Sequence, residues 1–219
     1  MLSTLRRFPV QQPFIFGTLY SAFKGGAVDF VVQTTHEGVA LKDWDTRRTA
    51  LFTLFNACFA GAWQYLLFVK IMGRLCPGAA AFAAKPLAEK LRDPVGIRNV
   101  LFQNAIENGI NNPLLYFPIF YSFKASLEGA ENPVRTGLQM YVANAHEDIP
   151  AIWSVWVPAQ LINFGFSPMW FRVPFVATVS AMWTAYVSVT RGKAPIDTGQ
   201  AAPAPATTTA TTPATAPSM

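Results

Sequence analysis

Residues 153–172 read WSVWVPAQLINFGFSPMWFR and lead directly into VPFVATVSAMWTAYVSV, residues 173–189, which carry no charge. The first segment places two prolines, Gln160, Asn163 and Arg172 among apolar and aromatic residues. Polar groups of this kind are costly in lipid, and they persist where they face a bundle interior, a hydrated cavity or the headgroup layer. The two segments together predict a polytopic membrane protein with a polar feature inside it.

The composition of the whole chain favours the same class of protein. Of its 219 residues, 52% are hydrophobic and 13% are charged, whereas soluble domains carry about 25% charged residues. A soluble protein with an unusually apolar core is the less favoured alternative. Because about four spans of roughly 20 residues fill most of this length, we expect an all-α fold, a polytopic membrane bundle of about four transmembrane helices plus amphipathic segments.

The apolar stretches of the sequence predict four membrane spans. We expect spans over residues 13–33, 49–72 and 93–127, the third bent at its prolines, and a last span that ends near residue 190. Ala57, Ala60, Gly61 and Ala62 offer the second span a surface of small residues for close helix contact. Residues 74–94 read as a turn and a short amphipathic helix that ends at Pro94.

The segment between the third and last spans is expected to be mostly a loop. Residues 130–150 read as a polar connection, and a helix begins near Ile149 or Pro150 with Asp148 as its cap and proline in its first turn. That helix should break between Gly165 and Pro168. We divide the chain into a basic N-terminal arm at 1–12, a membrane bundle at 13–190 and an extended Ala/Thr/Pro-rich tail at 191–219. The Lys and Arg counts of a four-span bundle place both termini on the more basic side.

Charge and chemistry exclude several classes of function. The net charge is +5, but no basic run exceeds two residues, so we expect no nucleic-acid partner and attribute the excess to anionic lipid. His36 and His146 fall in polar loops, and Cys58 and Cys76 have no second ligand at metal spacing. No nucleophile, acid–base pair or phosphate loop has the spacing of a catalytic motif. We therefore expect no enzymatic activity, no metal and no cofactor.

The polar residues inside the apolar segments allow two interpretations. Asp29 and Gln33 share one helix face, and Gln160 and Asn163 share another, from which they could bond freed backbone carbonyls, Asp29 or Glu107. Such residues either hold a bundle together by hydrogen bonds or line a wet path whose acids favour cations. We expect the tryptophans to be anchors at the membrane interface.

The C-terminal block also carries a family resemblance. Its order of residues resembles the family of Mpv-type inner mitochondrial membrane proteins and the twenty-two-kilodalton peroxisomal membrane protein. Weaker matches are Asp29 with Gln33, DWDTRR at 43–48, and Glu107 with Asn108 before Pro113, while Val157 and Tyr65 depart from the family pattern. The motif residues are Trp156, Pro158, Gln160, Asn163, Phe164, Pro168, Arg172, Trp183, Tyr186 and Ser188.

The resemblance implies a channel-like protein for small-solute passage or membrane homeostasis in an organellar membrane. The mitochondrial inner membrane is preferred, ahead of the peroxisome and the plastid. The alternative is a non-conducting accessory subunit of a large membrane complex, held through its helices and its tail; a homo-oligomer also stays open. The expected partners are thus the lipid bilayer and, as open alternatives, a large membrane complex or further copies of the chain. The residues expected to line a path or polar core are Asp29, Gln33, Glu107, Asn108, Gln160, Asn163 and Arg172.

Overall fold

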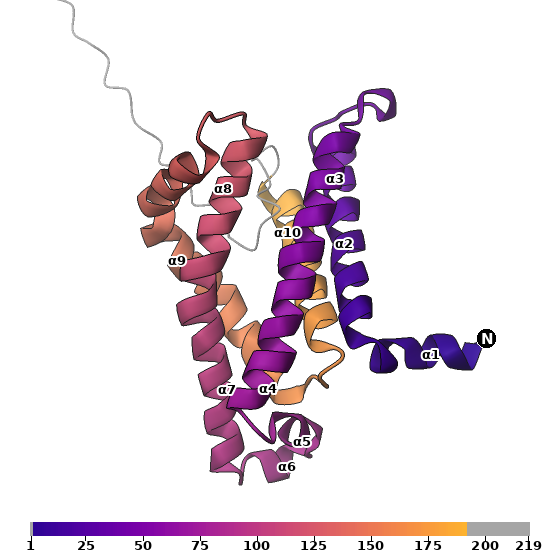
Figure 1. Cartoon of the computed structure of the whole chain (residues 1–219), viewed down its shortest axis with the longest axis vertical. Coiled ribbons are helices and arrows are strands. Elements are labelled where there is room, and N and C mark those ends of the chain that lie inside the picture. Colours follow the sequence, from indigo (N-terminus) through magenta and orange to yellow (C-terminus); the bar gives the residue numbers. More distant parts are fainter. Residues whose placement is uncertain (1, 192–219) are drawn as a thin grey trace, which may run out of the picture.

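The computed structural model describes the backbone of residues 2–191 and the side chains of residues 7–182. All regular structure in this part of the chain is helical, which confirms the all-α bundle. The expected tail beyond residue 191 and the side chains of Trp183, Tyr186 and Ser188 lie outside the described residues. Five helical passes run along the bundle (Figure 1), and they are α2, the run from α3 to α4, the run from α7 to α8, α9 and α10.

The first two passes form a tightly packed pair. Helix α2 (Pro13–Val31) begins with proline in its first turn and continues into the π-helix η1 (Val32–His36). After the short η2 (Leu41–Asp43), the second pass combines α3 (Thr46–Phe55), η3 (Asn56–Trp63), η4 (Leu66–Ile71) and α4 (Met72–Leu75). A Cβ atom on Gly61 would lie 2.7 Å from the Cα of Thr18. The two backbones therefore touch at the small-residue surface, as predicted.

The connection between the second and third passes differs from the prediction. It contains two short helices, α5 (Ala79–Ala84) and α6 (Leu87–Lys90), where one was expected. Pro94 does not end a helix but begins α7 (Pro94–Ile106), because proline suits the first helical position. The Asp93 carboxylate caps this helix by accepting from the Gly96 N–H at 2.9 Å.

The third pass is continuous over the expected residues. It runs from α7 through the π-helix η5 (Glu107–Tyr116), which contains Pro113, into α8 (Phe117–Leu127). The fourth pass is longer than predicted, since α9 (Pro133–Phe166) includes most of the segment expected to be a loop. Asn132 caps α9 by accepting from the Arg135 N–H at 3.1 Å, and proline again takes the first turn.

Packing on α8 explains why residues 133–148 are helical despite their polarity. The Phe117 and Tyr141 rings stack with centroids 5.4 Å apart, and a Cβ atom on Gly137 would lie 2.4 Å from the Ser122 nitrogen. Asp148 is not a cap, because it lies inside α9 and accepts a hydrogen bond from the Tyr121 hydroxyl. The expected break is confirmed, since α9 ends at Phe166 and α10 (Arg172–Arg191) follows.

The extra pass changes the expected topology. Figure 1 shows α1 (Leu2–Gln11) at one end of the bundle, and α10 running away from that end toward the other. Because residues 133–166 form a pass of their own, the described end of α10 lies at the opposite end of the bundle from α1. The C-terminal tail, on which the prediction that both termini lie on one side also depends, is outside the described residues. Within the described residues, Thr46–Leu75 and Pro133–Phe166 are long and apolar enough to cross a membrane.

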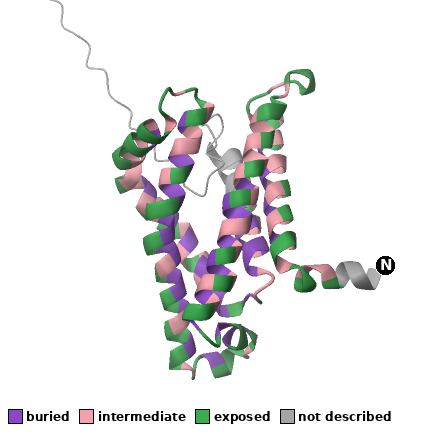
Figure 2. Ribbon diagram, viewed as in Figure 1, coloured by how far each residue is buried: buried purple, intermediate pink, exposed green. Residues whose placement is uncertain are grey.

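Helix α1 lies across the direction of the passes (Figure 1). Arg7 and Val10 are exposed on it, as they are in helices that lie in the plane of a membrane interface. The Phe14 ring, just after α1, packs against Tyr65 with centroids 5.3 Å apart. Figure 2 shows the buried residues mainly on helix faces that meet other helices, with exposed residues on the outside.

Candidate polar core of the bundle

Asp29 and Gln33 form a closed hydrogen-bonded lock between the first two passes. The buried Asp29 carboxylate accepts from Gln33 Nε2 at 2.8 Å and from the Thr49 hydroxyl at 2.5 Å, and Arg48 Nε lies 3.0 Å from it. Gln33 in turn bonds both backbone polar groups of Asp45. Asp29 thus pairs with Arg48, and this part of the predicted polar face joins helices.

Lys24, which with Asp29 is one of the two charged residues of α2, has neutral partners. Its ammonium group donates to Asn56 Oδ1 at 3.0 Å and to the Ser180 hydroxyl at 3.1 Å. These three residues come from α2, η3 and α10, so the lysine ties the first, second and fifth passes together. The sequence could not reveal this triad, because its members are separated by up to 156 positions.

Glu107 and Asn108 belong to a double stripe of polar side chains on the third pass. Asn104, Asn108 and Asn112 follow each other at four-residue spacing, and the amides of Asn108 and Asn112 each donate to the asparagine side chain one turn before. The Asn104 amide donates to the Val157 carbonyl of α9 at 3.2 Å. Trp153 of α9 donates to the Asn108 carbonyl at 2.9 Å. The residues of this double stripe, all buried, are Gln103, Asn104, Glu107, Asn108, Asn111 and Asn112.

The second pass contacts this stripe through an indole. Trp63 Nε1 donates to Asn111 Oδ1 at 2.8 Å, which joins η3 to η5. Among the described residues, one carboxylate oxygen of Glu107 has no hydrogen-bond partner. Of the stripe, the sequence interpretation selected Glu107 and Asn108 alone; the regular four-residue spacing was the signal that could have identified the others.

Arg172 is fully buried and is held by oxygen acceptors from three passes. Its guanidinium donates to Gln103 Oε1 at 2.9 Å and to the backbone carbonyls of Phe68 and Phe164 at 3.3 and 3.4 Å. The guanidinium carbon also lies 5.3 Å from the centre of the Phe164 ring. Arg172 is therefore not an anchor at the interface, and it joins the second, third and fourth passes.

Gln160 and Asn163 close the turn that leads into α10. Asn163 Nδ2 donates to Gln160 Oε1 at 2.9 Å and to the Arg172 carbonyl at 3.2 Å. The two amides share a face, as predicted, but they contact neither Asp29 nor Glu107. The family-motif residues Trp156 and Phe164 are buried beside them, while Pro158 and Pro168 are exposed.

The tryptophans do not all lie where they were expected. Trp156 is only 2% exposed and packs in the aromatic core, so the expectation of an interface anchor is wrong for it. Trp153 is 44% exposed yet bonds the stripe on the third pass, and Trp170 is half-buried against Phe16. Tryptophans in this chain thus contact neighbouring helices, and some of them are also exposed on the outer surface of the bundle.

Several buried polar atoms lie on one side of the Arg172 guanidinium. Gln64 precedes Phe68 by one turn on the descending second pass, and Glu107 follows Gln103 by one turn on the ascending third pass (Figure 1). Gln160 likewise lies one turn beyond Phe164 on that side. Within the described part of the chain, these atoms have no hydrogen-bond partner: Gln64 Oε1 and Nε2, Glu107 Oε2, Asn111 Nδ2, Asn112 Oδ1 and Gln160 Nε2.

The two cysteines lie apart from each other in the chain. Cys58 is exposed on η3 and Cys76 is buried after α4, where burial raises the pKa of its thiol. Among the described residues, no three His, Cys, Asp or Glu side chains gather in a way that could hold a metal ion.

The fold and the polar core together define a class, a helical membrane protein whose passes are joined through buried polar side chains. The model of the Mpv17 / PMP22 family matches residues 149–188, which include the turn from α9 to α10. Protein SYM1 of Debaryomyces hansenii is 24% identical over 180 residues, or 81% of this chain and 82% of that protein. Protein sym-1 of Neurospora crassa is 25% identical over 194 residues, or 88% of this chain and 100% of that protein.

These matches confirm the resemblance of the chain to the Mpv17 / PMP22 family and support an organellar membrane protein. No solved structure matches the chain significantly. The matched region includes Gln160, Asn163 and Arg172, so the family block coincides with the part of the bundle where three passes meet around one guanidinium.

Proposed function

We propose that this protein provides a narrow hydrated path for small solutes across an organellar membrane, with the mitochondrial inner membrane as its place. One observation carries the proposal: polar atoms of Gln64, Glu107, Asn111, Asn112 and Gln160 are buried between the passes without a partner among the described residues. A second candidate function is that of a non-conducting subunit of a larger membrane complex.

Unpaired polar atoms inside a membrane bundle favour water. A buried amide or carboxyl without a hydrogen bond costs about 1–3 kcal/mol by the measure of protein mutations, and several such groups occur together here. Buried water satisfies polar groups of this kind, with about three hydrogen bonds each. A file of water between the second, third and fourth passes would satisfy Gln64, Glu107 and Gln160 together, and small polar solutes could follow it.

Glu107 gives the path its proposed preference among ions. A carboxylate in a dry apolar interior is strongly disfavoured, whereas one that faces water is stable. Side-chain carboxylates that line a pore favour cations. Glu107 is the predicted acid that lacks a direct cationic partner among the described residues, since Asp29 is paired with Arg48.

Flux through liposomes tests this function. The purified protein should release small uncharged solutes but retain large ones, and it should pass small cations faster than anions of similar size. Glu107→Gln should keep the uncharged flux and lose most of the cation preference. The matched control is Glu128→Gln, because Glu128 is exposed in the loop after α8 and should leave both properties unchanged. A tight bilayer with correctly folded protein would contradict the path.

The second candidate is supported by the closed clusters at Asp29 and Arg172. The Asp29 carboxylate bonds Gln33 and Thr49 and pairs with Arg48. The terminal NH groups of Arg172 bond acceptors on three neighbouring passes, while its Nε has no hydrogen-bond partner among the described residues. Hydrogen bonds of this kind hold the helices of a bundle together and do not require a solute path between them. If the liposomes are tight, and the protein instead co-purifies from its native membrane in a stable large complex, the accessory-subunit function replaces the channel-like one.

A further inference from the structure

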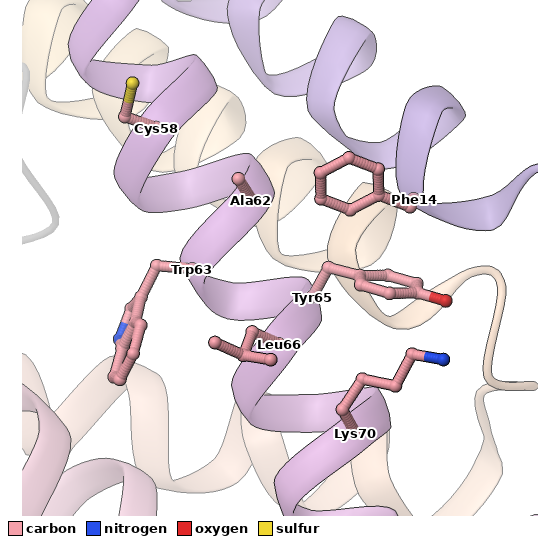
Figure 3. Close-up of a pocket in the computed structure, with 7 residues that line it drawn as sticks. All are labelled: Phe14, Cys58, Ala62, Trp63, Tyr65, Leu66 and Lys70. Carbon is pink, nitrogen blue, oxygen red and sulfur yellow. The ribbon is translucent and has the colours of Figure 1, made fainter.

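A groove of about 620 Å³ runs along the outer side of the second pass (Figure 3). Cys58, Ala62 and Leu66 line its apolar part. At its other end the Tyr65 hydroxyl and the Lys70 ammonium point toward the same side, as Figure 3 shows. The groove therefore has one apolar end and one end with a cation and a hydroxyl.

The length and depth of this groove match one leaflet of a bilayer. Cys58 and Lys70 lie twelve residues apart on the same pass, which is at most about 18 Å along a helix, and half of a hydrocarbon core is about 15 Å. Phe14 packs on Tyr65 directly after α1, the helix that lies across the bundle. Lys70 thus lies near the interface level that α1 marks, and Cys58 lies near the middle of the membrane.

A second apolar groove joins the first. It has a volume of about 300 Å³, lies between the second and third passes, and shares Cys58 and Trp63 with the first groove. Phe59 and Leu115 belong to its apolar lining. The two grooves together offer places for two apolar chains that diverge from a common region.

The basic side chains at the polar end of the groove favour a ligand with a negatively charged headgroup. Lys70 is exposed and takes part in no ion pair among the described residues, and Arg74 is exposed one turn further on. A basic side chain at a membrane surface attracts anionic lipid, and a hydroxyl donor can share a phosphate oxygen with it. We propose that this groove is a binding site for an anionic phospholipid, with its phosphate on Lys70 and Tyr65 and its acyl chains over Leu66, Ala62 and Cys58.

Alkylation of Cys58 by N-ethylmaleimide measures occupancy of the groove. In the full-length protein in detergent, dioleoylphosphatidylglycerol should slow labelling of Cys58 about fivefold more than dioleoylphosphatidylcholine, the factor expected for one basic side chain at an anionic surface. Lys70→Gln should remove that difference. Lys42→Gln is the matched control, since Lys42 is exposed in the loop at the opposite end of the pass. Cys76, which is buried, reports on unfolding.

Four outcomes would overturn this site. Equal protection by both lipids would show ordinary solvation of an apolar surface, and protection that persists in Lys70→Gln would exclude the proposed headgroup contact. Protection without lipid that rises with protein concentration would assign the groove to a second copy of the chain. Inorganic phosphate alone should not slow labelling, because the protection requires the acyl chains; if it does slow labelling, the site binds free anions.

Discussion

Arg172 illustrates how single residues join the bundle. Its side chain comes from the first turn of the fifth pass and reaches acceptors on the second, third and fourth passes. Arginine suits such a position because its planar guanidinium offers several fixed donors and stays charged. The buried guanidinium is held by an amide oxygen, two carbonyls and an aromatic ring, so its place depends on all four passes at once.

Replacing Arg172 should therefore destabilise the bundle strongly. Arg172→Ala leaves Gln103 Oε1 and two buried carbonyls without their donor and opens a cavity, and we expect a loss of about 3 kcal/mol. Arg172→Lys should recover only part of it, because an ammonium group cannot reproduce the fork. Thermal unfolding in detergent measures both. Arg135→Ala, at an exposed position of α9, is the control and should change stability by less than about 0.5 kcal/mol. An Arg172→Ala variant as stable as this control would refute the description.

The identity of the buried polar residues could be predicted from the sequence, but their partners could not. Asp29, Gln33, Gln160 and Asn163 stand out because they interrupt apolar segments, and all are buried. Gln103, which binds Arg172, lies 69 positions away from it. Which residues become hydrogen-bond partners across passes depends on the rotation and axial position of each helix relative to its neighbours. The periodicity of a single helix carries no information on these two quantities.

At the scale of elements, the passes are placed by close backbone contacts. α8 and α9 meet where a Cβ atom on Gly137 would lie 2.4 Å from the Ser122 nitrogen. The same region was expected to be a loop, because residues 130–150 are rich in Glu, Asn and Asp. The Asn132–Pro133 pair is the signal that marks the true start of α9, since it supplies a cap and a proline for the first turn.

Gly137→Ala should separate α8 from α9. Backbone atoms of Ser122 cannot move aside as a flexible side chain can, so we expect a loss of about 2–3 kcal/mol, typical of overpacking. Gly109→Ala is the matched control, because a Cβ there meets nothing within 4 Å. It should be neutral or stabilising by up to about 1 kcal/mol. Chemical unfolding of both variants measures the difference, and equal stabilities would show that the close contact does not hold these helices.

The start of α7 should contribute stability that depends on pH. The Lys85 ammonium, 2.7 Å away, and the Gly96 N–H hold the pKa of Asp93 below its ordinary value. A lowered pKa in the folded state gives stability that is present above the unfolded pKa, about 3.9, and is lost as the pH falls through the lower folded value. The difference in melting temperature between wild type and Asp93→Asn should thus be constant near neutral pH and shrink below about pH 4.

Lys85→Gln separates the two causes of this pKa shift. The substitution removes the ion pair but keeps the hydrogen bond from the Gly96 N–H to Asp93. The fall in melting temperature of Lys85→Gln with falling pH should therefore be intermediate between those of wild type and Asp93→Asn. Because Asp93 lies near the surface, the effect should be small and should weaken in salt. If the difference in melting temperature between wild type and Asp93→Asn grows as the pH falls below about 4, the lowered pKa of Asp93 is contradicted.

At the scale of the whole molecule, polar side chains extend through much of the bundle. The turn from α9 to α10, which carries Asn163 and Arg172, lies toward the end of the bundle that holds α5 and α6 (Figure 1). Glu107 begins η5 on the third pass, and Asp29 lies in the last turn of α2, toward the opposite end. The apolar surroundings and the amount of helix could be read from composition. The number of passes could not, because one polar stretch decides whether the chain turns back at residue 133.

The central claim is that the interior around Gln64 is open to water. It is tested most directly by a charged methanethiosulfonate reagent added to liposomes that hold single-cysteine variants with Cys58→Ser and Cys76→Ser. Gln64→Cys reports on the interior, and Leu19→Cys, at a position 58% exposed on the outside of α2, reports on the lipid-facing surface. We predict that Gln64→Cys reacts and Leu19→Cys does not. If Gln64→Cys resists the reagent as Leu19→Cys does, the interior is dry and the polar side chains only hold the helices together.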